Sequence, residues 1–184
     1  MVAGANASLT GENPGLGEIM VGLGWDAIAS HGPQAELVPL AVICGADGKA
    51  LSNEHLVFFN QVVSSDGAVT YADGDDEEEI DVDLTLVPAE VAKIVFIVYV
   101  DPDIRGPGTF TAVRSAYIRV AGAGAAAGVG ELVRFVVPST DNRNINAMVF
   151  GELYRHRDEW KFRALGQGYT TGLQGVGRDY EVGL

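Results

Sequence analysis

The sequence predicts an all-β protein, and three features of its 184 residues carry this prediction. Apolar segments are short and are separated by turn-forming residues, as at 45–48, 65–67 and 105–108. Several segments alternate apolar and polar side chains with a period of two, which is typical of half-buried strands. The run at 94–100 is apolar on both faces, which predicts a central strand covered on both sides. A β-sandwich or a barrel fits this pattern.

Ten strands are expected in chain order, near 17–25, 36–44, 55–61, 68–71, 78–84, 93–101, 114–121, 130–138, 146–155 and 158–165. The alternation is clearest at the end, where Trp160, Phe162 and Ala164 share one face. Segment 87–92 predicts a short helical turn, with Pro88 at its first position. The glycine- and alanine-rich segment 122–130 is expected to be a flexible hairpin loop. No linker divides the chain, so we expect residues 1–184 to form one domain.

Composition favours a folded protein of the cytoplasm. Hydrophobic residues make up 47% of the chain, enough for a packed core. The longest apolar runs are too short to span a bilayer, and the N-terminus lacks the features of a secretory signal. The single cysteine, Cys44, excludes an intrachain disulfide, and its apolar neighbours predict a buried thiol.

Negative charge is concentrated in the first half of the chain. The formal net charge is −13, and residues 1–104 hold 18 acidic side chains against only two lysines, Lys49 and Lys93. Such a surface repels phosphate backbones, so nucleic acid is not an expected partner. The same excess attracts divalent cations, but a solvated acidic face that aids solubility explains it equally well.

The densest acidic segment is 73–79, where six of seven consecutive residues carry a carboxylate. Calcium takes six to eight oxygen ligands, and a bound ion would relieve the repulsion among these side chains. Gly74 permits the tight bend that such convergence needs. Asp73, Asp75, Asp76 and Glu77 are therefore candidate ligands. The alternative is a solvated turn that runs into a strand whose Asp81 and Asp83 point outward.

Residues typical of a catalytic site do not form a recognisable pattern. The three histidines, His31, His55 and His156, lie in unrelated segments without zinc-ligand spacing. No serine or cysteine stands in a nucleophile motif such as G-x-S-x-G. The sequence therefore argues against an enzyme.

Several sequence blocks together resemble the TerD family of bacterial tellurite-resistance and stress proteins. They include VGLGWD at 21–26, FFNQ at 58–61, GDDE at 74–77, YIRV at 117–120, MVFGELYR at 148–155, EWKFRA at 159–164 and GQGY at 166–169. The resemblance implies a β-sandwich of two mostly antiparallel sheets with a few short helical turns. It also implies a non-catalytic role in the cytoplasm and calcium held by acidic loops. Other stress or tellurite-resistance proteins, including ones at the membrane surface, are the implied partners.

The resemblance extends the candidate metal set residue by residue. Asp26 and Glu36 match acidic positions of the family, while Asn60 is either a ligand or a structural residue at a strand end. The full predicted set is Asp26, Glu36, Asn60, Asp73, Asp75, Asp76 and Glu77. Val38 stands where the family usually has a second carboxylate, and the acidic loop is shorter than usual, so a weakened calcium site is expected. The sequence thus predicts a calcium-modulated binding or scaffold domain, or a metal-free interaction domain of the same fold.

Overall fold

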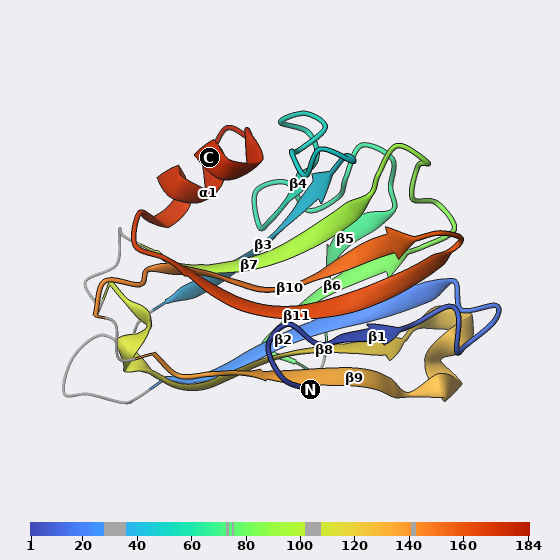
Figure 1. The fold of residues 1–184 in the computed structure, drawn as a ribbon, viewed down its shortest axis with the longest axis horizontal. Helices are drawn as coiled ribbons and strands as arrows, with labels where there is room; N and C mark the ends of the chain where they lie inside the picture. Colours follow the sequence, from blue (N-terminus) through green and yellow to red (C-terminus); the bar gives the residue numbers. More distant parts are fainter. Residues whose placement is uncertain (28–35, 73, 75, 102–107, 141–142) are drawn as a thin grey trace.

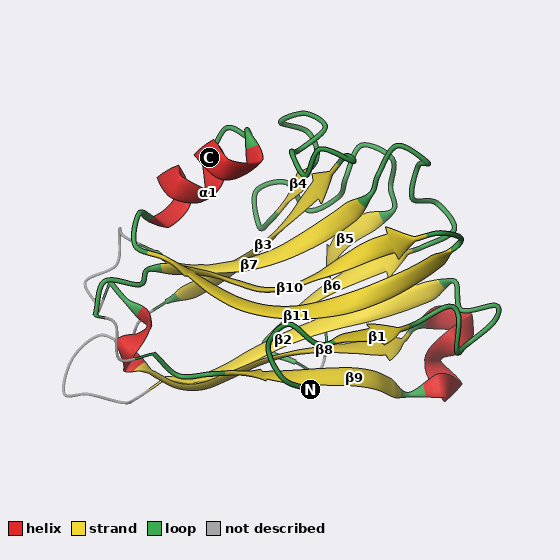
Figure 2. Ribbon diagram, in the orientation of Figure 1, coloured by secondary structure: helices red, strands yellow, loops and turns green. Residues whose placement is uncertain are grey.

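Two antiparallel sheets pack face to face in the computed structural model, which describes residues 1–27, 36–72, 74, 76–101, 108–140 and 143–184 (Figure 1). Strands dominate, and the helices lie at the periphery (Figure 2). The predicted β-sandwich of two antiparallel sheets is confirmed. No helix in the described residues is long and apolar enough to cross a membrane.

Six strands form sheet A, in the order β1-β11-β10-β7-β3-β4. Their bounds are β1 Asn6–Ser8, β3 Leu37–Cys44, β4 Leu56–Val57, β7 Lys93–Val100, β10 Ala147–His156 and β11 Glu159–Tyr169. Five strands form sheet B, in the order β5-β6-β2-β8-β9. Their bounds are β2 Glu18–Ala27, β5 Val69–Ala72, β6 Glu78–Asp83, β8 Val113–Gly122 and β9 Glu131–Val137.

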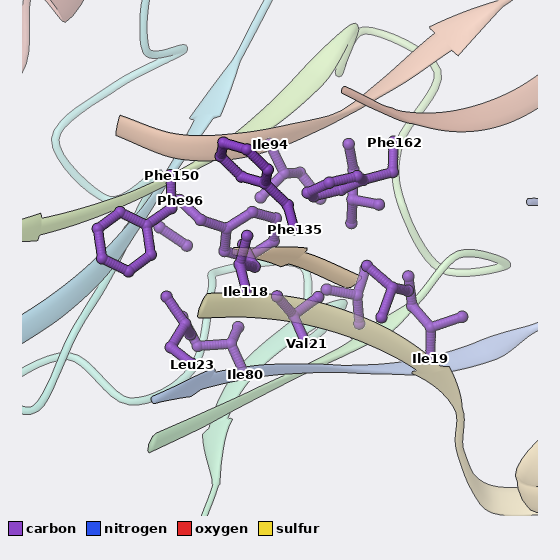
Figure 3. Packing of buried hydrophobic residues seen from close by; sticks show 14 of the residues in the cluster. Ile19, Val21, Leu23, Ile80, Ile94, Phe96, Ile118, Phe135, Phe150 and Phe162 are labelled. Atoms are coloured by element: carbon purple, nitrogen blue, oxygen red, sulfur yellow. The ribbon is translucent and has the colours of Figure 1, made fainter. Parts of the chain in front are cut away.

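The main core lies between the two sheets (Figure 3). Every second side chain of the strands points into it. Examples are Val21 and Ile118 of sheet B and Phe96 and Phe162 of sheet A. Each of these four is fully buried. This is the arrangement that the alternating sequence pattern predicts, because every second side chain of a strand points to the same face.

A second apolar layer covers the outer face of sheet A. The helix α1, Gly172–Tyr180, lies over this face and contributes the fully buried Val176 (Figure 1). Below it, Val42, Val95 and Ile97 point away from the main core and are themselves buried. The layer explains why strand β7 is apolar on both faces, as its sequence predicted.

Sequence reasoning missed α1 and the short strand β1, and it misjudged three other segments. The helix contains Gly172, Gly175 and Gly177, which lower intrinsic helix propensity and hide its apolar positions. Residues Gly124–Val129, expected as a flexible loop, form the 3-10 helix η2, and a second 3-10 helix, η1, spans Phe110–Ala112. The expected helical turn at 87–92 is a simple turn closed by the Val91 N–H donating to the Pro88 carbonyl. The strand expected at 55–61 shrinks to the two residues of β4.

Candidate functional site

Asp76 belongs to the acidic turn between β5 and β6, and it attaches this turn to the outer face of sheet B. The Tyr117 hydroxyl donates to Asp76 Oδ1, and Arg119 Nε donates to Asp76 Oδ2 at 2.7 Å. The Asp76 side chain is only 7% exposed, so this carboxylate is buried against β8. A buried carboxylate needs such charged and hydrogen-bonding partners, since both of its oxygens have lost water.

Two glycines of β2 provide the space for this cluster. Gly22 is paired with Arg119 and Gly24 with Tyr117 across the β2–β8 ladder. A Cβ at residue 22 would lie 1.9 Å from Asp76 Oδ2, and a Cβ at residue 24 would lie 2.4 Å from the Tyr117 ring. The VGLGWD segment therefore has glycine at two successive outward positions because an anion and an aromatic ring occupy the places of their side chains.

The cations around Asp76 are in turn held by a second carboxylate. Arg119 Nη1 lies 3.6 Å from Glu131 Oε2, and Arg134 Nη2 lies 2.9 Å from the same oxygen. The Arg134 guanidinium also stacks on the Tyr117 ring, 4.4 Å from its centroid. The hydrogen bonds from Arg134 lower the pKa of Glu131, while burial and then the bond to Asp76 raise the pKa of Tyr117. We call Asp76, Tyr117, Arg119, Glu131 and Arg134 the Asp76 cluster.

The remaining described carboxylates of the turn are also engaged. Glu77 Oε2 accepts the Trp25 N–H at 3.3 Å, and Glu78 accepts the Tyr71 hydroxyl. Glu79 Oε1 accepts the Asp76 N–H at 3.2 Å. Burial is the largest cause that raises the pKa of Glu77, although the bond from Trp25 opposes it. The turn is thus fixed by protein donors rather than by mutual convergence of its carboxylates.

Of the other predicted ligands, Asp26 lies near Glu77, whose pKa its charge helps to raise, while Glu36 and Asn60 belong to the other sheet and its turns. Asp26 is exposed at the end of β2, and its nearest cation is Arg114, at 3.9 Å. Glu36 precedes β3 in the other sheet, and Asn60 is exposed in the turn after β4. Asp73 and Asp75 fall outside the described residues. Within the described ranges, no three acidic, histidine or cysteine side chains are grouped so that they could hold a metal ion.

Comparison with known proteins identifies the family. The TerD domain matches residues 1–180 of this chain. The chain belongs to the TerD family. The tellurium resistance protein TerD of Serratia marcescens is 37% identical over 97% of this chain and 95% of its own length. General stress protein 16U of Bacillus subtilis is 33% identical over 98% of this chain and 95% of its own length.

A solved TerD homologue has the same fold. The crystal structure of a telluride resistance protein homologue from Streptomyces coelicolor superposes with a TM-score of 0.62, over 84% of this chain and 91% of that one, at 23% identity. Resemblance to the TerD family, inferred from the sequence blocks, is therefore confirmed.

Three of the TerD-like sequence blocks meet in the Asp76 cluster. VGLGWD contains Gly22 and Gly24, which leave space for the cluster. GDDE contains Asp76, and YIRV contains Tyr117 and Arg119. Sequence reasoning named only Asp76 and missed its partners. The available signal was the alternation in YIRV, since Tyr117 and Arg119 face outward while Ile118 and Val120 enter the core.

Calcium, which the TerD resemblance implies, does not fit the described donors as a preformed set. Both oxygens of Asp76 accept bonds from Tyr117 and Arg119, so a positive charge already neutralises this carboxylate. Val38, where the resemblance implied that a carboxylate is missing, is buried in the apolar layer on sheet A. The described neighbours of Val38 in this layer, Leu40 and Tyr99, are not carboxylates, so the position adds no ligand to the acidic turn of the other sheet.

Proposed function

We propose that this TerD-family chain is a non-catalytic binding domain of the tellurium-resistance and stress response that presents an acidic surface of sheet B to a basic protein partner. The observation that carries the proposal is a row of outward carboxylates on neighbouring strands. Glu18 of β2 is paired directly with Asp83 of β6, and Asp81 lies one pleat further along β6. We call Glu18, Asp81 and Asp83 the acidic row.

The charges of the acidic row cost stability, although Asp83 Oδ1 also accepts bonds from the Thr85 N–H, at 2.9 Å, and the Thr85 hydroxyl, at 2.5 Å, which an asparagine can keep. Like charges placed directly opposite each other in a sheet are destabilising. Burial, followed by the charges of Glu79 and Glu18, raises the pKa of Asp81. The three carboxylates line a hollow of about 290 Å³ on the outer face. A lysine or arginine from a partner would neutralise this row, and complementary charge accelerates and orients protein association.

The chemistry of the chain's thiol supports a non-catalytic role. Cys44 is the only cysteine, it is fully buried, and desolvation raises its pKa to about 12. The thiolate is the reactive form of cysteine, so this side chain offers no nucleophile to a tellurium compound at neutral pH. We propose instead that the chain protects against tellurium compounds by binding another protein. The proposed compartment is the cytoplasm.

Calcium is proposed as a weak ligand of the acidic turn and not as part of its framework. The turn already has a cation in place, because Arg119 bonds to Asp76. The negative field of the turn attracts a divalent ion, but among its described carboxylates Asp76, Glu77, Glu78 and Glu79 already accept bonds from protein donors. The calcium prediction made from the sequence stays a prediction.

The proposal is tested by tellurite challenge of cells that lack this gene and are complemented with variants. Glu18→Gln, Asp81→Asn and Asp83→Asn are combined in one variant, and Glu12→Gln, Glu54→Gln and Glu90→Gln in a control that removes the same charge from exposed sites elsewhere. We expect the acidic-row variant to melt at or above the wild-type midpoint yet to lose protection, while the control protects. Full protection by a folded acidic-row variant would contradict the proposed surface.

A further inference from the structure

An apolar pocket lies on the outer face of sheet A, on the opposite side of the sandwich from the acidic row. Its volume is about 330 Å³, within the range of pockets that take small molecules. Leu40 of β3 and Tyr99 of β7 line it from the sheet, Leu56 of β4 and Phe58 from one side, and Leu173 of α1 from the other. None of the described residues that line it is cationic.

The walls of the pocket are fixed by hydrogen bonds. Asn53 Oδ1 accepts the Gly183 N–H at 2.8 Å, which ties the segment after α1 to the loop before β4. Gln61 Nε2 donates to the Glu54 carbonyl at 3.1 Å and to the Leu56 carbonyl. Val176 holds α1 against the sheet. The pocket therefore exists before a ligand arrives, which lowers the ordering cost of binding.

Two carboxylates, those of Glu36 and Asp101, lie beyond the Tyr99 end of the pocket without lining it. Val38 and Leu40 point outward on β3, so strand alternation places Glu36 on the same face. By the same rule Asp101 follows Tyr99 outward, about 7 Å further along the strand direction. The Asp101 N–H donates to the Glu36 carbonyl at 2.9 Å, so these two residues lie side by side just beyond the β3–β7 ladder. Burial, and then the charges of Asp101 and Glu36, raise the pKa of Tyr99.

We propose that this pocket binds a small molecule with an apolar body and a cationic head, such as a lipophilic amine. The apolar body lies against Leu40, Leu56 and Leu173, and the cation lies beyond Tyr99, next to Glu36 and Asp101. The charge at the end of the pocket decides between ligands: an anion is repelled, a neutral molecule gains only burial, and a cation gains both burial and attraction. This site is independent of the acidic row, so each proposal can fail without the other.

The test is a titration of the ¹⁵N-labelled protein, followed by amide chemical shifts, with 4-phenylbutylamine, 4-phenylbutanol and 4-phenylbutyrate. These probes share one apolar body and differ in the charge of the head. We expect the amine to bind most tightly and the carboxylate most weakly, with shifts at Leu40, Tyr99 and Leu173. Added salt should weaken binding of the amine and leave binding of the alcohol unchanged.

Two variants sharpen the test. Glu36→Gln should weaken amine binding by about two- to fivefold, the range of an exposed ion pair, without affecting the alcohol. Glu90→Gln, an exposed acid outside the pocket, should change neither. Leu173→Trp should fill the pocket and abolish binding of both probes. Equal affinity for amine and alcohol, an unchanged amine affinity in Glu36→Gln, or no shifts at the pocket residues with any probe would each overturn the proposal.

Discussion

At the scale of single residues, Asp76 shows how a side chain's partners change the role that its sequence suggests. Within the run of carboxylates it has the chemistry of a calcium ligand. In the structure, Tyr117 and Arg119 occupy both of its oxygens, so it fastens the acidic turn to sheet B. No rule of local sequence could reveal this, because the partners lie more than 40 positions further along the chain.

Gly22→Ala tests this role of Asp76. The new methyl group would meet Asp76 Oδ2 and displace the carboxylate from Arg119. We expect a loss of about 1–3 kcal/mol in the free energy of unfolding, measured in urea. Gly128→Ala is the control, since a Cβ there meets nothing within 4 Å. Equal stability of the Gly22→Ala variant and the wild type would show that the turn does not depend on this contact.

At the scale of elements, the strands could be predicted and the segments that cover them could not. The apolar side chains of Trp160, Phe162 and Ala164 alternate with polar ones in the sequence, and all three enter the core. Successive side chains of a strand point to opposite faces, so the apolar ones can all lie on the buried face. The helix α1 has an apolar stripe at Leu173, Val176 and Tyr180, but its glycines obscure it. The outward side chains of β3 and β7 are apolar, which indicates that another segment covers this face of sheet A.

The alternation of inward and outward side chains in β10 and β11 predicts which substitutions lower the free energy of unfolding most. Phe150 is fully buried and Trp160 is 5% exposed, both within the main core. We expect Phe150→Ala and Trp160→Ala each to lower the free energy of unfolding by about 3–5 kcal/mol, because each leaves a large cavity. Val136→Ala, at an outward position of β9, should change it by less than about 0.5 kcal/mol. Denaturant melts measure these changes. A loss of less than about 1 kcal/mol in the free energy of unfolding for either aromatic would contradict its assignment to the buried face.

At the scale of the whole molecule, the two outer faces of the sandwich differ in chemistry. Sheet B carries the Asp76 cluster and the acidic row, while sheet A carries an apolar layer under α1. Composition predicted the acidic excess, but not its division between faces, which depends on which strands share a sheet. The candidate site was therefore predictable as a segment and not as an arrangement.

Alkaline pH should loosen the apolar layer on sheet A. Burial is the largest cause that raises the pKa of Cys44 from 9.0 to about 12 and that of Tyr169 from 10.0 to about 12, and it also raises the pKa of Tyr180. The folded state holds these protons more tightly than the unfolded state, so this stability is present below about pH 9 and is lost as pH rises towards about 12.

Urea melts at pH 8, 9.5 and 10.5 should therefore show a falling free energy of unfolding. Tyr169→Phe, which removes a titrating group but also its 2.9 Å bond to Asp179, should be less stable at pH 8 and less sensitive to alkali. A free energy of unfolding that stays constant or rises over this range would show that these groups are not desolvated as the fold implies.

The most direct test of the central claim, that the protein's own cations hold the acidic turn, is a thermal melt of the wild type and Asp76→Asn with EDTA and with 1 mM calcium. Loss of the charge-assisted bonds should lower the midpoint in EDTA by about 4–8 °C for a chain of this size. A weak calcium site should raise the wild-type midpoint by less than about 2 °C. Equal midpoints of the two proteins in EDTA, together with a rise of several degrees in the wild type at 1 mM calcium, would show instead that the turn is a metal site.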